Sequence, residues 1–281
     1  MIDDLKHIIY RTVLEANRKM APGDVEKAVA RSAGISRKRV RLAIRDLVGT
    51  GELRFTYVHG TSFLERSFDR PVRLSKRIVV KPPHTSYRPA PGEVVVDIAG
   101  GAAFGNGAHP TTCLALRALD HVFDGDRYVE SKAPLNGLDI GTGSGILAIA
   151  LAMLGVHDVI GIDVDPCAVS EATHNVLLNG LAERISIRNT PLEKLASRFS
   201  VIVANLAYLT LKRIAPSLSA GTEENGLLIL SGFLEPAAEN LHKAYAEQGF
   251  RLVREETERG WGCMTLCRSH FKTPSNARWL C

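Results

Sequence analysis

The stretch "LNGLDIGTGSGILAIALAMLGVHDVIGIDVD", residues 135–165, decides the fold. A short apolar run ends near Asp139, an apolar segment typical of a helix reaches Leu154, and a second apolar run ends at Asp163. Between the first run and the helix lie three alternate glycines, Gly141, Gly143 and Gly145. Strand, glycine loop, helix and strand in this order form the repeating unit of a parallel sheet with right-handed crossovers. The stretch therefore predicts an α/β, Rossmann-like fold.

The same stretch also predicts a ligand site. Glycines at a helix N-terminus let a ligand lie against the backbone, and Asp163 after the second strand can accept both hydroxyls of a ribose. A dinucleotide would fit this much of the pattern. However, the pattern Asp-x-Gly-x-Gly-x-Gly lacks the later glycine of the dinucleotide fingerprint. That difference favours S-adenosylmethionine.

A polar residue ends a later apolar run, "FSVIVANLAYL", and supports the same ligand. Asn205 would lie at the carboxyl end of its strand, where the crevice of a doubly wound sheet opens. Its side-chain oxygen, with nearby backbone carbonyls, can orient an amine. The alternative is that Asn205 only caps a turn.

Upstream, "AAFGNGAHPTT", residues 102–112, is too rich in glycine for a strand and too poor in charge for a linker. This stretch and five later ones match the sequences of a known enzyme family, in the same order along the chain. The stretches that match are "FGNGAHPTT", "LDIGTGSGILAIA", "GIDVDPCAV", "HNVLLNG", "VIVANLAYLTLKRIAPSL" and "LLILSGFLEPAAENLHKAYAEQGF". Over residues 102 to about 268 the chain resembles the PrmA family of methyltransferases, which act on a ribosomal protein.

The resemblance implies a seven-stranded class I methyltransferase domain over residues 96–270, with S-adenosylmethionine as cofactor. Its cofactor site would comprise Phe104, Thr112, Asp139, Gly141, Gly143, Gly145, Asp163 and Asn205. The loop around Thr112 would fold over the methionine end of the cofactor. Two positions depart from the family, which usually has Thr at Asn106 and Cys at Thr142.

The resemblance also implies transfer of a methyl group to a nitrogen, an amine of a protein substrate such as a ribosomal protein. Asn205 would aim the amine, and Tyr208 would close over the methyl group or the target chain; these two are the predicted catalytic residues. His109 is a candidate general base, but a base with a pKa near about 6.5 helps little with an amine, so a role in holding the loop is favoured. Trp261 is expected to be structural.

The N-terminal part has a different charge. Residues 1–80 carry 17 Lys/Arg and 9 Asp/Glu. Three predicted helices and a β-hairpin over residues 1–68 follow the winged-helix order, with Arg37, Lys38, Arg41 and Arg45 on the exposed side of the third helix. These residues would contact nucleic acid through phosphates, or they are a solvated face; winged helices also dock proteins or dimerise. A methyltransferase of nucleic acid or a small amine, or a regulator that senses S-adenosylmethionine, are the alternative functions.

The remaining expectations concern boundaries and location. Residues 69–95, with five prolines, are expected to be a linker holding one or two strands, and residues 271–281 a tail of no assigned role. The chain shows no apolar run long enough for a membrane span, no signal peptide and no cluster typical of a metal site. Five scattered cysteines suggest free thiols, so a cytoplasmic protein is predicted.

Overall fold

The computed structural model describes residues 2–16, 18–58, 60–124 and 134–268. The chain divides into two compact units, Met1–Arg70 and Pro71–Cys281. The division lies two residues beyond the end expected for the N-terminal domain. The predicted tail 271–281 lies outside the described residues.

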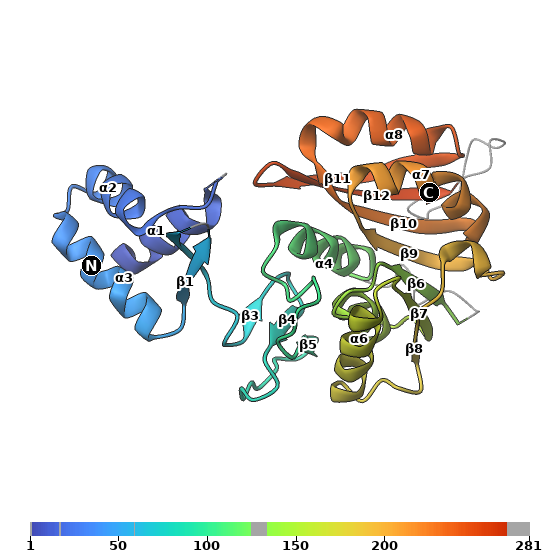
Figure 1. Ribbon diagram of the computed structural model, residues 1–281, viewed down its shortest axis with the longest axis horizontal. Coiled ribbons are helices and arrows are strands. Elements are labelled where there is room, and N and C mark those ends of the chain that lie inside the picture. The colour runs from blue at the N-terminus through green and yellow to red at the C-terminus, as the bar shows by residue number, and fades with distance from the viewer. Residues whose placement is uncertain (1, 17, 59, 125–133, 269–281) are drawn as a thin grey trace. The chain divides into compact units, whose positions relative to one another are not determined.

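The first unit contains three helices followed by an antiparallel hairpin, in the order expected from the sequence (Figure 1). Its elements are α1 (Ile2–Glu15), α2 (Pro22–Ala33), α3 (Arg37–Gly49), β1 (Leu53–Val58) and β2 (Thr61–Arg66). Apolar side chains at helical spacing, including Ile9, Val25, Val29 and Val40, are fully buried where the three helices meet. This spacing gives each helix one apolar face, and burial of the three faces forms the core of the unit.

The second unit begins with a small three-stranded sheet of β3 (Val72–Arg73), β4 (Ile78–Lys81) and β5 (Val94–Asp97). β4 pairs antiparallel with β3 and parallel with β5. Most of the segment expected to be a linker therefore belongs to the second unit.

The main sheet has seven strands in the order β11-β12-β10-β9-β6-β7-β8. Its strands are β6 (Asn136–Ile140), β7 (Asp158–Ile162), β8 (Ile185–Arg188), β9 (Phe199–Asn205), β10 (Thr222–Leu234), β11 (Phe250–Glu258) and β12 (Trp261–Arg268). Neighbours from β10 to β8 are parallel, and β12 pairs antiparallel with β10 and β11. The strand order reverses between β6 and β9, which is where open α/β sheets bind their ligands. The Rossmann-like seven-stranded fold is thus confirmed.

Helices cover both faces of this sheet (Figure 1). On one face lie α4 (Pro110–Val122), α5 (Ile146–Met153) and α6 (Pro166–Leu178), and on the other α7 (Tyr208–Gly221) and α8 (Ala238–Ala246). Two short 3-10 helices, η1 (Leu192–Lys194) and η2 (Glu235–Ala237), follow β8 and β10.

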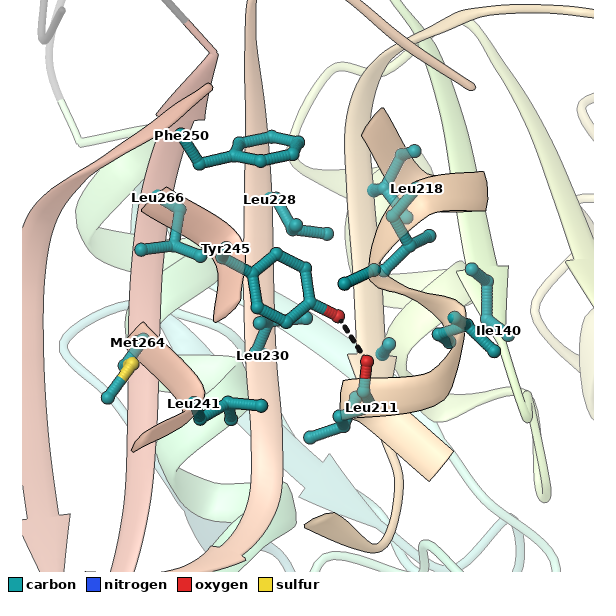
Figure 2. Close-up of a cluster of buried hydrophobic side chains, with 14 of the residues drawn as sticks. Ile140, Leu211, Leu218, Leu228, Leu230, Leu241, Tyr245, Phe250, Met264 and Leu266 are labelled. Carbon is teal, nitrogen blue, oxygen red and sulfur yellow. Dashed lines mark hydrogen bonds between the residues drawn. The ribbon is translucent and has the colours of Figure 1, made fainter. Parts of the chain in front are cut away.

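Figure 2 shows the core under α7 and α8, which surrounds the side chain of Tyr245. Tyr245 is fully buried, and its hydroxyl donates to the Leu211 carbonyl oxygen at 2.7 Å. A buried phenol needs such a partner, because an unpaired hydroxyl in an apolar core destabilises the fold. The bond fixes α8 to the first turns of α7, directly beyond Asn205 at the end of β9.

No described helix is both long and apolar enough to span a bilayer. Cys113, Cys167 and Cys263 are free thiols.

Candidate functional site

A cavity of about 750 Å³ opens at the carboxyl ends of β6, β7 and β9. It is lined by backbone of the glycine loop, by polar side chains at the strand ends and by the loop that precedes α4. Of the predicted site residues, Phe104, Gly141, Gly143, Asp163 and Asn205 line it. Its volume lies in the range of pockets that bury a small organic ligand, roughly 300–1,000 Å³.

The glycine loop and the upstream loop pack together at the cavity wall. Gly143 has φ +54°, and a Cβ there would lie 2.3 Å from the carbonyl oxygen of Phe104. That oxygen accepts from Ser144 N at 2.9 Å, and the Gly105 oxygen accepts from the Ser144 hydroxyl at 2.7 Å. Only glycine permits this approach of two backbones, so residue 143 is required by the contact between the loops.

Asp163 follows β7 and is half-buried at the cavity wall. One carboxylate oxygen accepts from Gly143 N and the other from Asp165 N, both at 3.0 Å. A carboxylate offers about four acceptor positions, so each oxygen can still accept a further hydroxyl. Asp163 can therefore bind a diol while it holds the glycine loop in place.

Asp139 lies behind this wall and is not among the residues that line the cavity. One of its oxygens accepts from the Thr142 hydroxyl at 2.7 Å and from Ala148 N at 3.1 Å. Its other oxygen is buried and has no hydrogen-bond partner among the residues that the structure describes. Asp139 was predicted as a cofactor contact, but it lies behind the cavity wall and holds the glycine loop through Thr142 and Ala148. Burial, and to a smaller extent the charge of Asp163, raises the pKa of Asp139 to about 7.

This pKa predicts a pH-dependent stability. The pKa in the folded state lies above the ordinary value of 3.8, so the folded protein binds this proton more tightly than the unfolded chain. The free energy of unfolding attributable to Asp139 should fall as pH rises between these two values, by up to about 1.4 kcal/mol per pH unit, and then level off. Urea unfolding at a series of pH values, in wild type and Asp139→Asn, measures this. Equal pH slopes in both proteins would contradict the prediction.

His109 caps the N-terminus of α4 and lines the cavity. Its Nδ1 accepts from Thr111 N at 3.3 Å and lies 2.8 Å from the Thr111 hydroxyl. The ring lies edge-on to Phe104, with ring centroids 5.2 Å apart, and to Trp261, at 4.9 Å. These contacts place His109 at the centre of the loop, as the scaffolding interpretation requires, and Trp261, expected to be only structural, lines the cavity as well.

His109→Ala should weaken cofactor binding more than it lowers turnover, because the cap and both aromatic contacts are lost together. The loss of a helix cap costs about 1 kcal/mol. Calorimetry with S-adenosylhomocysteine and steady-state kinetics separate the two effects. A large fall in kcat with unchanged affinity would instead identify His109 as a base.

Asn205 lines the cavity at the end of β9, and its Nδ2 donates to the Thr112 hydroxyl at 3.4 Å. Thr112 is fully buried and is not a lining residue, whereas Thr111 is one. Gly145, also predicted as a cofactor contact, caps α5 and packs against Ala172 instead of lining the cavity. Tyr208 is not among the lining residues either and packs against the core under α7.

Asn106, which departs from the family pattern, is exposed and makes a local contact. Its Oδ1 accepts from Ala108 N at 3.0 Å. A threonine hydroxyl can accept in a similar local turn, so the exchange preserves the loop.

In the first unit, two arginines of α3 have a partner within the fold. Arg41 binds the two oxygens of Glu26 through Nε at 2.7 Å and Nη2 at 2.9 Å, and Arg37 adds a bond at 3.3 Å. The Glu26 side chain is 7% exposed, and the hydrogen bond from Arg41 is the main cause that lowers its pKa. Arg37 and Arg41 therefore neutralise a buried carboxylate, and all four predicted surface residues, Arg37, Lys38, Arg41 and Arg45, are exposed. Among the described residues, no group of His, Cys, Asp and Glu is arranged to hold a metal ion.

Comparisons with known proteins show the family of this chain. Residues 64–269 match the family model described as "Ribosomal protein L11 methyltransferase (PrmA)". The chain belongs to the PrmA family. A ribosomal protein L11 methyltransferase from Geotalea daltonii is 35% identical over 204 residues, which are 72% of this chain and 65% of that relative. One from a Geobacter species is 40% identical over 197 residues, 70% of this chain and 63% of the relative.

A solved structure of a related protein is similar to this chain as well. The ribosomal protein L11 methylase from Lactobacillus delbrueckii subsp. bulgaricus superposes with a TM-score of 0.63 at 30% identity, over 72% of this chain and all of that one. The chain matches less than two thirds of the length of the relatives from Geotalea and Geobacter. Most of the first unit precedes the region that the PrmA family model matches.

Proposed function

We propose that this protein is an S-adenosylmethionine-dependent N-methyltransferase whose acceptor is an amine of a ribosomal protein. The observation that carries the proposal is that Asp163, after β7, and Asn205, at the end of β9, line one cavity with the glycine loop, on either side of β6. The Asp163 carboxylate suits a ribose diol, and the Asn205 side-chain oxygen suits an amine. The PrmA family membership supports the same reaction.

The residues present fit the cofactor. Gly141 and Gly143 present bare backbone at the cavity wall, because a Cβ at either position would clash with Leu206 or with the Phe104 oxygen within 2.4 Å. Asp163 keeps acceptor positions for the ribose hydroxyls. Phe104 and Val164, at the edge of the cavity, are exposed by 54% and 82% and offer apolar surface to a ring or to the methionine chain. S-adenosylmethionine, when bound, supplies a methyl group on a cationic sulfur.

The chain's own contribution to the reaction is orientation. Asn205 is held through its Nδ2 by the Thr112 hydroxyl, which leaves its side-chain oxygen to accept from an amine N–H. A lysine amine has an ordinary pKa near about 10.4, and burial beside a cation lowers it. Asn205 and the neighbouring carbonyls therefore need only aim a neutral amine, and positioning of this kind supplies a large part of catalysis.

The first unit, we propose, is a winged helix that contacts a macromolecular partner through the exposed face of α3 that carries Lys38 and Arg45. Arg37 and Arg41 pair with Glu26, and their side chains stay 57% and 53% exposed on the same unit. A protein partner fits the proposed acceptor, and nucleic acid is the alternative. Cytoplasmic location stays a prediction.

The proposal is tested by incubating the protein with a bacterial lysate and methyl-labelled S-adenosylmethionine, followed by protease or nuclease. If protease releases the label and nuclease does not, the acceptor is a protein. Label released by nuclease would move the function to nucleic acid, and no label above a lysate without the protein would contradict methyl transfer.

A further inference from the structure

One face of α6 and its C-cap carry three polar side chains at four-residue spacing, Glu171, Asn175 and the C-cap Asn179, and none of the three was predicted as a site residue. Side chains at this spacing lie above one another on a helix. All three bind the backbone of residues 97–103, which connect β5 to Phe104. A polar row that would pass for a solvated helix face thus holds the segment that leads into the cavity wall.

The two asparagines fix the first part of this segment. Asn179 accepts from Asp97 N at 2.9 Å and donates to the Asp97 oxygen at 2.7 Å. Asn175 is 1% exposed; it accepts from Ala99 N at 3.0 Å and donates to the Ser144 oxygen at 2.8 Å. Through Asn175, the segment and the glycine loop are tied to the same helix. An asparagine amide can make both bonds at once because it carries a donor and an acceptor.

Glu171 holds the part that touches the cavity. One carboxylate oxygen accepts from Ala102 N at 2.8 Å and the other from Ala103 N at 2.9 Å. Ala102 and Ala103 both line the cavity, so Glu171 grips this wall from its outer side. Charged acceptors make stronger hydrogen bonds to N–H groups than neutral ones do. Gly101 allows the contact, because a Cβ there would lie 2.1 Å from a Glu171 oxygen.

We propose that Glu171 is a positioning residue for cofactor binding, a latch that holds the wall of residues 102–104 closed. The inference rests on the proposed function. Beyond Phe104 the wall is bound to the buried Ser144. At Ala102 and Ala103 it is bound to Glu171, which is only half-buried. The Glu171 contact is the more accessible of the two, so its opening frees Ala102 and Ala103 at the cavity wall while Phe104 stays bound to Ser144, and this loosening speeds the release of product.

The chain offers a matched pair of variants for the test. Gly101→Ala must displace the Glu171 carboxylate, whereas a Cβ at the adjacent Gly100 meets nothing within 4 Å. Glu171→Gln breaks the same contact from the helix side, because the amide keeps one acceptor oxygen and turns a donor towards an N–H. Glu183→Gln, an exposed carboxylate of the same unit, controls for the lost charge.

Affinity for S-adenosylhomocysteine is measured by calorimetry and its dissociation rate by stopped flow, with thermal unfolding alongside. Gly101→Ala and Glu171→Gln should each weaken affinity and accelerate dissociation by about tenfold or more, which is the effect of losing one charge-assisted bond. Gly100→Ala and Glu183→Gln should bind as wild type does. A shared loss of affinity without a matching loss of thermal stability identifies positioning, which a purely structural role would not produce.

The outcomes separate this inference from the function on which it rests. If wild type does not bind S-adenosylhomocysteine, the proposed function is contradicted and the latch with it. If wild type binds and both latch variants match their controls, only the latch is contradicted. Should one of the two variants fail to fold, the other decides.

Discussion

Asn205→Ala should lower kcat by about 100-fold or more, while affinity for S-adenosylhomocysteine stays close to that of wild type. Misplacement of a reacting group by about 1 Å costs this much, because orientation carries a large share of the barrier reduction. Asn205 sits at the end of β9 inside the cavity, and the side-chain oxygen is the group proposed to aim the amine. Single-turnover kinetics with saturating cofactor and a lysine-containing protein substrate measure the loss.

Thr112→Val is the companion variant to Asn205→Ala. It keeps the volume of residue 112 and removes the hydroxyl that accepts from Asn205 Nδ2 at 3.4 Å. A long hydrogen bond of this kind orients without adding much energy, so kcat should fall by less than in Asn205→Ala and in the same direction. Unchanged kcat in Asn205→Ala would contradict the orienting role and leave the asparagine as a turn residue.

Asp163→Ala should weaken binding of S-adenosylhomocysteine by about 1.5–3 kcal/mol, which is roughly 10- to 150-fold. Two effects add: the ribose hydroxyls lose a charged acceptor, and Gly143 N loses the bond that holds the glycine loop. Calorimetry gives the affinity directly. Asp158→Ala is the control, because Asp158 stands at the other end of β7, exposed to solvent.

Equal affinity in Asp163→Ala and wild type would place the ribose elsewhere. Asp163→Asn refines the result, since one oxygen remains to accept from Gly143 N while the charge is lost. An intermediate affinity is expected for it.

The parts of the site that lie at the ends of parallel strands were predictable. The stretch 135–165 contains a complete strand, loop, helix and strand, so its local pattern already specifies the topology. Asp163 and Asn205 each follow an apolar run, and the carboxyl ends of parallel strands meet at one edge of the sheet. Both therefore line the cavity as expected.

Other parts depend on packing that no local pattern reports. Thr111 and Thr112 are neighbours, and the start of α4 at His109 decides which of them lies at the cavity wall. Trp261 reaches His109 only because β12 folds back antiparallel beside β10. Glu171 lies on a helix whose polar row would normally face solvent, and its partners are backbone groups about 70 residues away in the chain.

The segment expected to be a linker was predictable in part. Its sequence between residues 69 and 95, with five prolines, predicted a linker that holds one or two strands. The strands form, since β4 pairs with β5, but the segment also packs on the second unit, where the Arg77 side chain donates to Asp120 of α4 at 2.6 Å. The prolines do not prevent the pairing, because they lie outside the paired residues.

The most direct test of methyl transfer to a ribosomal protein is the intact mass of purified ribosomal protein L11 after incubation with this protein and S-adenosylmethionine. The expected result is a mass increase by whole methyl groups, mapped by fragmentation to amine nitrogens, in wild type and not in Asn205→Ala. An unchanged mass, with the protein shown by calorimetry to bind S-adenosylhomocysteine, would contradict ribosomal protein L11 as the acceptor.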